Sequence, residues 1–334
     1  MFESRDHSLA QPADYPQWLA DIGGTNARFA WRAHEGAAIS HVQVMPCADH
    51  DNLLNAARSY LHKQGLSTPP CAAFGIATPI TGDAVAMTNN HWKFSVNALR
   101  EALGLHRLVL LNDFTALSLS LPHLPSGQKR QVGAGQAAPR SAIGLIGPGT
   151  GLGVSGLLPS VQGNGWVPIA GEGGHVSLSA SNHLEFEVIQ HLQQRYGHVS
   201  AERVLSGAGL VDLYRALCEI EGFQGPLLHT AAEVLTQGKE AFNAQAEHTL
   251  DMFCGFLGSV AGDLALTLGA RGGVYIGGGI VPRLGERLDA SAFRNRFEAK
   301  GRYQHYLEEI PTWVIDSPVS PALLGASQAL STIL

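Results

Sequence analysis

The chain has 334 residues, of which 45% are hydrophobic and 15% are charged, and its formal net charge is −6. This length suggests two domains, and this composition is typical of a globular protein with substantial cores rather than a disordered chain. Because 22 basic residues face 28 acidic ones and form no basic block, the sequence does not indicate a nucleic-acid-binding protein.

The cysteines and one long apolar segment bear on two further classes. The four cysteines are scattered without a CxxC pair, so neither a zinc site nor a disulfide framework is indicated, and a reducing cytoplasm is the simplest compartment. Residues 252–270 resemble a membrane span, but they are rich in glycine and carry Asp263 near their middle, where a charge is costly in a bilayer. We expect a buried helix there and no membrane.

Short β-like runs alternate with helical ones along the chain, and this alternation predicts an α/β fold. Residues 18–32 read as two strands joined by a tight Gly-Gly turn, and residues 141–158 repeat this pattern. Other predicted strands are 71–80, 107–111, which leads to Asp113, and the start of 272–284, which breaks into a Gly-rich loop. Predicted helices are 96–105, 181–197, 210–220 and 320–334.

The two Gly-rich turns, which follow Asp21 and Gly147, resemble each other. Glycines let a backbone approach a phosphate closely, and successive amides form an anion-binding nest. Thr25 and Thr150 add hydroxyl donors, and Asp21 is placed to hold Mg2+ through water. Either turn alone could be an ordinary Gly-rich turn, but the pair indicates duplicated domains that face each other across a ligand-binding cleft.

Two common nucleotide-binding motifs do not fit the sequence. No GxxxxGK[ST] string occurs, which excludes a Walker-type P-loop. A GxGxxG string spans residues 151–156, but prolines, glycines and β-formers follow it instead of the helix that a dinucleotide site requires. A dinucleotide-binding dehydrogenase is therefore disfavoured.

Several long motifs resemble those of the bacterial glucokinase family, within the hexokinase/actin-like ATPase superfamily. The resemblance runs from Trp18 nearly to the end of the chain. Its segments are DIGGTNARFA, LLNDFTALSL, GPGTGLGVSGL, GEGGHVSLS, GHVSAERVLSG and GGVYIGGGIVPR. The sequence departs from the family pattern at Ala20, Pro148 and Gly277, none of which is an expected sugar contact.

The resemblance implies an α/β, two-domain actin-like ATPase (ribonuclease H-like) fold with a cleft between the domains. It divides the chain into a flexible N-terminal extension over 1–17, a small domain over 18–121 plus 318–334, and a large domain over 122–317. It also implies transfer of the γ-phosphate of ATP to the 6-hydroxyl of glucose, the entry step of glycolysis, by a cytoplasmic homodimer that uses Mg2+.

Asp113 is, by this resemblance, the general base that receives the proton of the sugar hydroxyl, and Asn112 beside it binds sugar hydroxyls. We also expect Asp113 to cap the helix that follows, since Asp is a favoured N-cap. The two roles are compatible, because a residue at a strand-to-helix junction can cap the helix and still reach a ligand.

Glu172, His175 and Glu202 are implied as further sugar ligands, with Asn89 as a weaker candidate. Read without the resemblance, Glu172 and His175 are an ordinary loop acid and a surface histidine. Glu202 is then an acidic residue in the first turn of a helix, and Asn89 is a turn residue. The resemblance assigns ATP binding to residues that surround the Gly-rich turns: Asp21, Ile22, Gly23, Gly24, Thr25, Asn26, Gly149, Thr150, Gly151, Gly278 and Gly279.

Three other classes of protein on the same fold are alternatives to a glucokinase. A hexokinase of broader sugar scope stays open, because hexose epimers differ by one hydroxyl. A non-catalytic sugar-sensing regulator on the same fold would carry a DNA-binding module, for which the short N-terminal segment leaves no room, and would tolerate loss of Asp113. Related kinases with a Cys-rich zinc loop are disfavoured, because no cysteine lies between Cys71 and Cys218.

Overall fold

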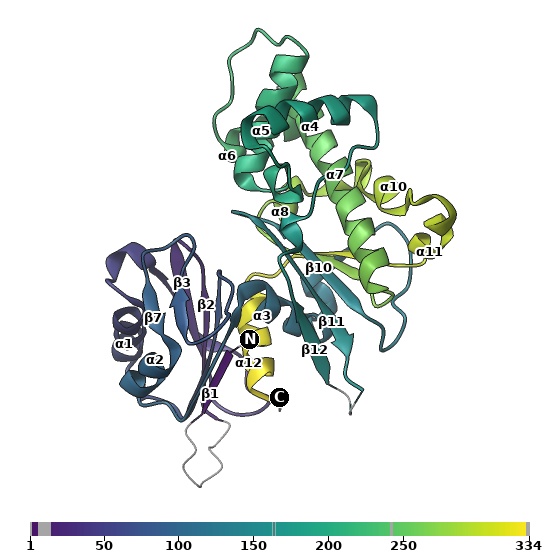
Figure 1. The fold of residues 1–334 in the computed structure, drawn as a ribbon. Helices are drawn as coiled ribbons and strands as arrows, with labels where there is room; N and C mark the ends of the chain where they lie inside the picture. The colour runs from purple at the N-terminus through teal and green to yellow at the C-terminus, as the bar shows by residue number, and fades with distance from the viewer. Residues whose placement is uncertain (1, 6–14, 162, 164, 241–242, 332–334) are drawn as a thin grey trace. The chain divides into compact units, whose positions relative to one another are not determined.

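The structure is a computed structural model that describes residues 2–5, 15–161, 163, 165–240 and 243–331. The chain divides into two compact units, each with its own hydrophobic core. Unit 1 comprises residues 1–124, 162–170 and 317–334, and unit 2 comprises residues 125–161 and 171–316. Both units combine a β-sheet with helices (Figure 1).

The sheet of unit 1 has the strand order β1-β8-β5-β2-β3-β4. In chain order its strands are β1 (Phe2–Arg5), β2 (Gln17–Ile22), β3 (Asn26–Arg32), β4 (Ser40–Pro46), β5 (Cys71–Ile76) and β8 (Arg107–Asn112). The central strand β5 is buried along its whole length, as is typical of a strand that has parallel neighbours and covered faces. A separate hairpin consists of β6 (Ala84–Ala86) and β7 (Lys93–Ser95).

The parallel strands of this sheet end in register. Ile22 of β2 pairs with Ile76 of β5, and Ile76 pairs with Asn112 of β8. The loops that follow these three strands therefore begin at one edge of the sheet. Residues 2–5, within the stretch expected to be an N-terminal extension, form β1 antiparallel to β8, and residues 6–14 lie outside the described residues.

The α-helices of unit 1 within the described residues are α1 (Leu53–Gln64), α2 (Val96–Leu103), α3 (Asp113–Ser120) and α12 (Pro321–Ser331). The first two lie on one face of the sheet, and α3 and α12 lie together on the other (Figure 1). The predicted helix over 96–105 is confirmed as α2, which Ser95 caps and which ends at Gly104 in the left-handed conformation.

The C-terminal helix α12 packs tightly on α3. At Gly325 the two helices approach so closely that a Cβ atom would overlap the carbonyl oxygen of Ala116. Polar contacts also tie α12 to the sheet, since Arg107 Nη1 donates to the Leu330 carbonyl at 2.8 Å and Arg32 Nη1 donates to Ser327 Oγ at 2.7 Å. The packing of α12 thus determines the position of α3 within unit 1.

A second six-stranded sheet has the order β12-β11-β10-β13-β14-β9, and all of its strands except β12 belong to unit 2. Its strands are β9 (Lys129–Val132), β10 (Ile143–Pro148), β11 (Leu152–Pro159), β12 (Trp166–Ala170), β13 (Val274–Ile276) and β14 (Thr312–Ile315). Strands β10, β13 and β14 are parallel, with Ile146 paired with Ile276. The chain therefore leaves β10 and β13 at the same edge of this sheet.

The helices of unit 2 surround α7, the longest of the described helices (Figure 1). They are α4 (His183–Tyr196), α5 (Gly207–Ile220), α6 (Ala231–Lys239), α7 (Ala244–Leu268), α8 (Val281–Leu284), α9 (Glu286–Ala290), α10 (Phe293–Glu298) and α11 (Gln304–Glu308). By length and composition α7 could cross a membrane, but 72% of its most apolar stretch of 18 residues is buried inside the protein. The prediction of a buried core helix is confirmed.

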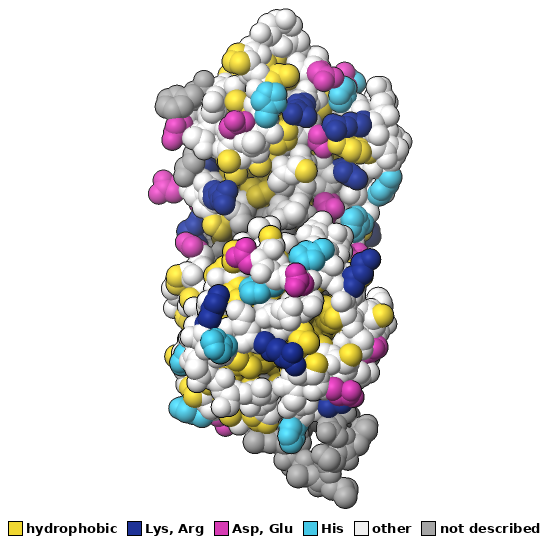
Figure 2. Space-filling model, turned by 90° about the vertical axis from the view of Figure 1, so that its left-hand side faces the viewer, with side chains coloured by type: hydrophobic (Ala, Val, Ile, Leu, Met, Phe, Trp, Pro, Cys, Tyr) yellow, Lys and Arg dark blue, Asp and Glu magenta, His cyan; other side chains and the backbone are white. Residues whose placement is uncertain are grey.

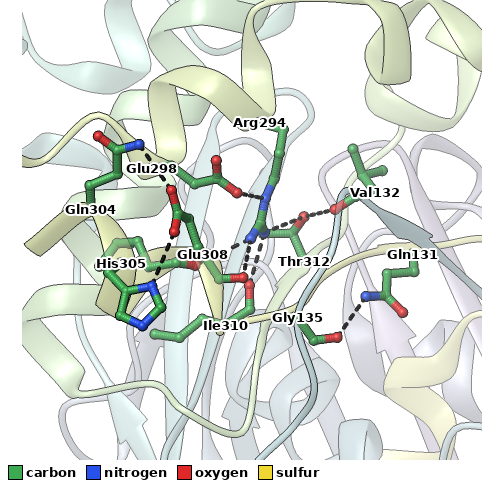
Figure 3. A network of polar contacts seen from close by, with 11 residues as sticks. Gln131, Val132, Gly135, Arg294, Glu298, Gln304, His305, Glu308, Ile310 and Thr312 are labelled. Atoms are coloured by element: carbon green, nitrogen blue, oxygen red, sulfur yellow. Dashed lines mark hydrogen bonds and ion pairs between the residues drawn. The ribbon is translucent and has the colours of Figure 1, made fainter.

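Arg294 of α10 organises the segment that leads into β14 (Figure 3). Its guanidinium donates to the carbonyl oxygens of Ile310, at 2.8 Å, and Glu308, at 3.1 Å, and it forms an ion pair with Glu298. Thr312 Oγ1 then donates to the Val132 carbonyl at 2.6 Å, which joins β14 to β9. One side chain thus satisfies carbonyl groups that the end of α11 leaves unpaired.

The predicted strand-turn-strand units are both confirmed, as β2–β3 and β10–β11. The helix predicted over 210–220 begins earlier, at Gly207, because Ser206 caps it by accepting from the Gly209 amide.

On the face drawn in Figure 2, basic side chains are interspersed with acidic side chains and histidines.

The contact between α12 and α3 predicts a large effect of Gly325→Ala on stability. A backbone carbonyl cannot move aside as a flexible side chain can, so we expect the free energy of unfolding to fall by about 2–3 kcal/mol, the upper part of the range for overpacking. Urea unfolding followed by circular dichroism measures this. Gly82→Ala is the matched control, because no atom lies within 4 Å of its added Cβ. Equal midpoints for the two variants would contradict the prediction.

Candidate active site

The first Gly-rich turn, residues 23–25, joins β2 to β3 at the carboxyl edge of the unit 1 sheet. The Gly23 amide donates to the Asn26 carbonyl at 2.9 Å and closes the turn. Thr25 and Asn26 are exposed, whereas Ile22 is buried. Ile22 thus anchors the turn in the core, and the exposed residues of the turn can contact a ligand.

Cys47 contacts this turn through both its amide and its thiol. Its amide donates to the Thr25 carbonyl at 2.8 Å, and its thiol lies 3.6 Å from the Gly23 carbonyl in donor geometry. Burial raises the pKa of this thiol, against the opposing effect of a hydrogen bond with Asn90. The sulfur therefore stays protonated and can donate, and two carbonyl groups of the turn are already occupied on the Cys47 side.

Asn89 contacts the same turn through its backbone. A Cβ atom at Gly24 would lie 2.7 Å from the Asn89 carbonyl oxygen and 2.9 Å from the Asn89 Cβ. Because real Cβ atoms do not approach other atoms so closely, Gly24 allows the loop of residues 87–92 to rest on the turn. The structure therefore brings Asn89, expected to be a sugar contact, beside the first Gly-rich turn.

Asn112 and Asp113 lie where β8 passes into α3, at the sheet edge from which the first turn also leaves. The expectation that Asp113 caps α3 is wrong. Asn112 is the N-cap, and its Oδ1 accepts from the amides of Phe114, at 2.9 Å, and Thr115, at 3.3 Å. Asn112 takes the N-cap position because its backbone is extended, whereas Asp113 is already the first residue of the helix.

Asp113 is the first residue of α3, partly exposed, and its Oδ1 accepts from the Phe114 amide at 2.9 Å. A negative charge in the first turn of a helix is stabilised by the helix dipole. The carboxylate is thus held at the end of a buried strand and is ready to accept a further hydrogen bond from a ligand.

Asp21 precedes the first turn and forms an ion pair with Arg28 across the β2–β3 hairpin, at 2.9 Å between Oδ2 and Nη1. Among the described residues no group of three or more His, Cys, Asp or Glu side chains could hold a metal ion. This donor set, one carboxylate beside the exposed Thr25, fits Mg2+ that keeps most of its waters and arrives with phosphates, rather than a closed protein cage.

The second Gly-rich turn, residues 149–151, joins β10 to β11 in unit 2. The Gly149 amide donates to the Gly151 carbonyl at 2.8 Å, and the Gly149 carbonyl accepts from the Gly207 amide at 2.8 Å, at the start of α5. Thr150 is exposed. In the described part of the chain, the amides of Thr150 and Gly151 have no protein acceptor, so they can donate to an anion.

The loop after β13 packs directly on this turn. The Gly277 amide donates to the Ile146 carbonyl at 2.8 Å, and the Ile280 amide donates to the Pro148 carbonyl at 3.3 Å. Gly278 has φ +78°, and a Cβ there would overlap the Pro148 carbonyl. Only glycine fits this position, while Gly279 beside it is exposed.

The Gly-Glu-Gly-Gly-His segment contains a 3-10 turn over Gly173–His175 and leaves the Glu172 and His175 side chains exposed. Its continuation pairs with the segment before Glu202. The Ala201 amide donates to the Val176 carbonyl at 2.9 Å, and the Leu178 amide donates to the Val199 carbonyl at 3.0 Å. Glu172 and His175 therefore lie in a segment that backbone hydrogen bonds connect to the segment of Glu202.

Glu202 lies in the first turn of a helical segment that follows Ser200, as expected, but this segment is a single 3-10 turn, Ala201–Arg203, and not part of an α-helix. The reason is that α5 has its own N-cap, Ser206, further along the chain. Glu202 Oε2 accepts from the Leu152 amide at 2.8 Å, at the first residue after the second turn. The structure thus brings this predicted sugar ligand against the predicted phosphate-binding turn.

The sequence analysis missed residues that act through their backbone. Leu152, Gly207 and Cys47 each donate an amide to the site, and such a contribution carries no residue-type signal. Cys47 is buried, as a small apolar residue would be. Its position behind the first turn follows only from the pairing of β3 with β4.

Comparison with known proteins agrees with this geometry. The glucokinase family model matches residues 18–333. Glucokinases from Aromatoleum aromaticum and Chromobacterium violaceum are 53% and 49% identical to the chain, over 96% and 97% of its length and 96% and 92% of theirs. The crystal structure of a glucokinase from an Antarctic psychrotroph superimposes with a TM-score of 0.85 at 38% identity, and covers 95% of this chain and 98% of that one.

The fold is the actin-like ATPase fold of sugar kinases, with a Gly-rich hairpin turn in each unit. These findings define an ATP-dependent hexose kinase. Within that class the chain belongs to the glucokinase family.

The contact between Gly24 and Asn89 predicts a difference between two neighbouring glycines of the first turn. Gly24→Ala must displace either the turn or the Asn89 loop, so we expect the KM for ATP to rise about tenfold, the scale of a lost hydrogen bond to a charged group. Gly23→Ala is the matched control, since its Cβ would meet nothing closer than 3.7 Å. Steady-state kinetics at saturating glucose measures both. Equal KM values would show that this packing does not shape the site.

Proposed function

We propose that this glucokinase-family protein transfers the γ-phosphate of ATP to the 6-hydroxyl of glucose, with Asp113 as the base. The observation that carries this assignment is the position of Asp113 at the same sheet edge as the first Gly-rich turn, which follows from the register of β2, β5 and β8. The products are glucose 6-phosphate and ADP.

In the proposed step, Asp113 accepts the proton of the 6-hydroxyl while the hydroxyl oxygen forms a bond to the γ-phosphorus. The bond between that phosphorus and the bridging oxygen of ADP breaks, and ADP leaves with the electron pair. Phosphoryl transfer passes through a loose transition state, so positioning and charge neutralisation matter more than a strong base. A carboxylate at a rigid strand-to-helix junction meets the first need.

ATP binding is assigned to the two turns and the loop after β13. The free amides of Thr150 and Gly151, with the Thr150 hydroxyl, are suited to phosphate oxygens. In unit 1 the contributing residues are Asp21, Gly23, Gly24, Thr25 and Asn26, with Ile22 as their anchor in the core, and in unit 2 they are Gly149, Thr150, Gly151, Gly278 and Gly279. Mg2+, held by Asp21 through water, would neutralise charge on the phosphate oxygens.

Glucose binding is assigned to Asn112 and Asn89 in unit 1 and to Glu172, His175 and Glu202 in unit 2, in addition to Asp113. These side chains offer donors and acceptors for several hydroxyls, as a hexose requires. The Asn112 amide group has one donor on the Thr78 carbonyl, at 3.4 Å, and its oxygen caps α3, so it contributes chiefly through its remaining N–H.

The proposal also includes the domain organisation, the compartment and the oligomeric state of the protein. Residues 18–121 with 318–334 act as a small domain, and residues 122–317 act as a large domain. The protein works in the cytoplasm as a homodimer at the entry step of glycolysis. The four cysteines are reduced and buried in the structure, which is compatible with that compartment.

Replacement of Asp113 tests the base. We expect Asp113→Ala and Asp113→Asn to lower kcat at least about 100-fold, the usual contribution of a general base, with a smaller loss of glucose affinity measured by calorimetry. Asp83→Asn is the control, because the Asp83 carboxylate binds Ser95 and the Asn97 amide at the start of α2, and its kcat should not change. Near-normal turnover in Asp113→Ala would remove Asp113 as the base.

A substrate panel tests the sugar. With glucose, mannose, fructose and N-acetylglucosamine at equal concentrations, we expect the highest kcat/KM for glucose, since a site that hydrogen-bonds each hydroxyl rejects sugars that leave its polar groups unpaired. A coupled assay for ADP measures all four. Similar values for several hexoses would favour a broader hexokinase, and absence of turnover with every sugar would favour a sugar-sensing regulator.

A further inference from the structure

Glu202 contacts the second Gly-rich turn through one carboxylate oxygen only. Its Oε2 accepts from the Leu152 amide at 2.8 Å, immediately after the turn of residues 149–151. In the described part of the chain, Oε1 has no hydrogen-bond partner. The side chain is partly buried, so the hydrogen bond forms in a region that water reaches only in part.

Besides the loop after β13, which packs on the residues before the turn, two backbone hydrogen bonds of Gly149 hold the turn. The Gly149 amide binds Gly151 within the turn, and the Gly149 carbonyl accepts from Gly207. These two bonds fix the N-terminal side of the turn, whereas the bond from Leu152 to Glu202 fixes its C-terminal side. Removal of the carboxylate would leave that amide unpaired and the end of the turn free to move.

Gly151 has no side chain at the place where this carboxylate lies. A Cβ atom on Gly151 would come within 2.5 Å of Glu202 Oε2. The φ of Gly151 is not in the left-handed region, so its backbone conformation does not by itself require glycine. A Cβ at this position would therefore push the Glu202 carboxylate away from its place.

We propose that Glu202 is a positioning residue for the nucleotide as well as a sugar ligand. Oε2 holds the second turn through Leu152, so that the Thr150 and Gly151 amides stay aligned for phosphate, and Oε1 remains for a sugar hydroxyl. This inference rests on the proposed function for the assignment of the two substrates. It links the sugar ligand to the phosphate turn through one carboxylate within unit 2.

The test measures nucleotide binding without sugar, by calorimetry with Mg2+ and a non-hydrolysable ATP analogue. We expect Glu202→Ala to raise the Kd about tenfold, the scale of a lost charge-assisted hydrogen bond. Glu202→Gln should keep the Kd within about threefold, since its amide oxygen accepts from Leu152 in the same way. His175→Ala, a sugar-side control with an exposed side chain, should leave the Kd unchanged.

The same variants separate this inference from the proposed function. An unchanged Kd in Glu202→Ala overturns the positioning role, whatever happens to the KM for glucose. A raised Kd with an unchanged KM for glucose supports the positioning role and removes Glu202 from the sugar site. Thermal unfolding by circular dichroism confirms that each variant is folded.

Gly151→Ala supplies a second, independent arm. Because its Cβ would displace the carboxylate, we expect it to raise the nucleotide Kd as Glu202→Ala does. If both act through one hydrogen bond, the double variant should bind no more weakly than Glu202→Ala alone. A double-mutant cycle in which the two effects add would show that they are independent, and the proposed linkage would be wrong.

Discussion

The candidate active site depends on parallel strands that end in register. In unit 1 the pairs Ile22–Ile76 and Ile76–Asn112 bring the ends of β2, β5 and β8 to one sheet edge. In unit 2 the pair Ile146–Ile276 does the same for β10 and β13. A one-residue slip in any of these strands would turn its side chains to the opposite face, so the buried core and the site geometry constrain each other.

Given these edges, each turn is held mainly by backbone groups, to which the Cys47 thiol adds one hydrogen bond at the first turn and the Glu202 carboxylate one at the second. Cys47 and the Asn89 loop support the first turn, and the loop after β13 supports the second. A backbone carbonyl is kept in every substitution and an amide N–H in every substitution except to proline, and neither carries a charge that would repel a phosphate. This arrangement lets a protein with net charge −6 offer donors to an anion without a basic patch.

Much of the fold could be predicted from the sequence, because it follows from local patterns. Apolar runs on both sides of a Gly-rich turn identified β2–β3 and β10–β11, and the helical pattern that ends at Gly104 identified α2. The roles within the site were less accessible. Whether Asn112 or Asp113 caps α3 depends on which residue keeps extended backbone geometry. The partner of Glu202 is an amide 50 residues earlier, and no spacing rule connects the two.

The tight contact between α12 and α3 has a consequence for the order in which the chain can fold. Arg107 bonds to Leu330, 223 positions later, and Arg32 bonds to Ser327, 295 positions later. Unit 2 draws its residues from between these partners. During synthesis the ribosome therefore releases all of unit 2 before the helix that fixes the depth of α3 exists. Since domains fold as units while the chain emerges, unit 2 can fold first, and the segment that carries Asp113 reaches its final packing last.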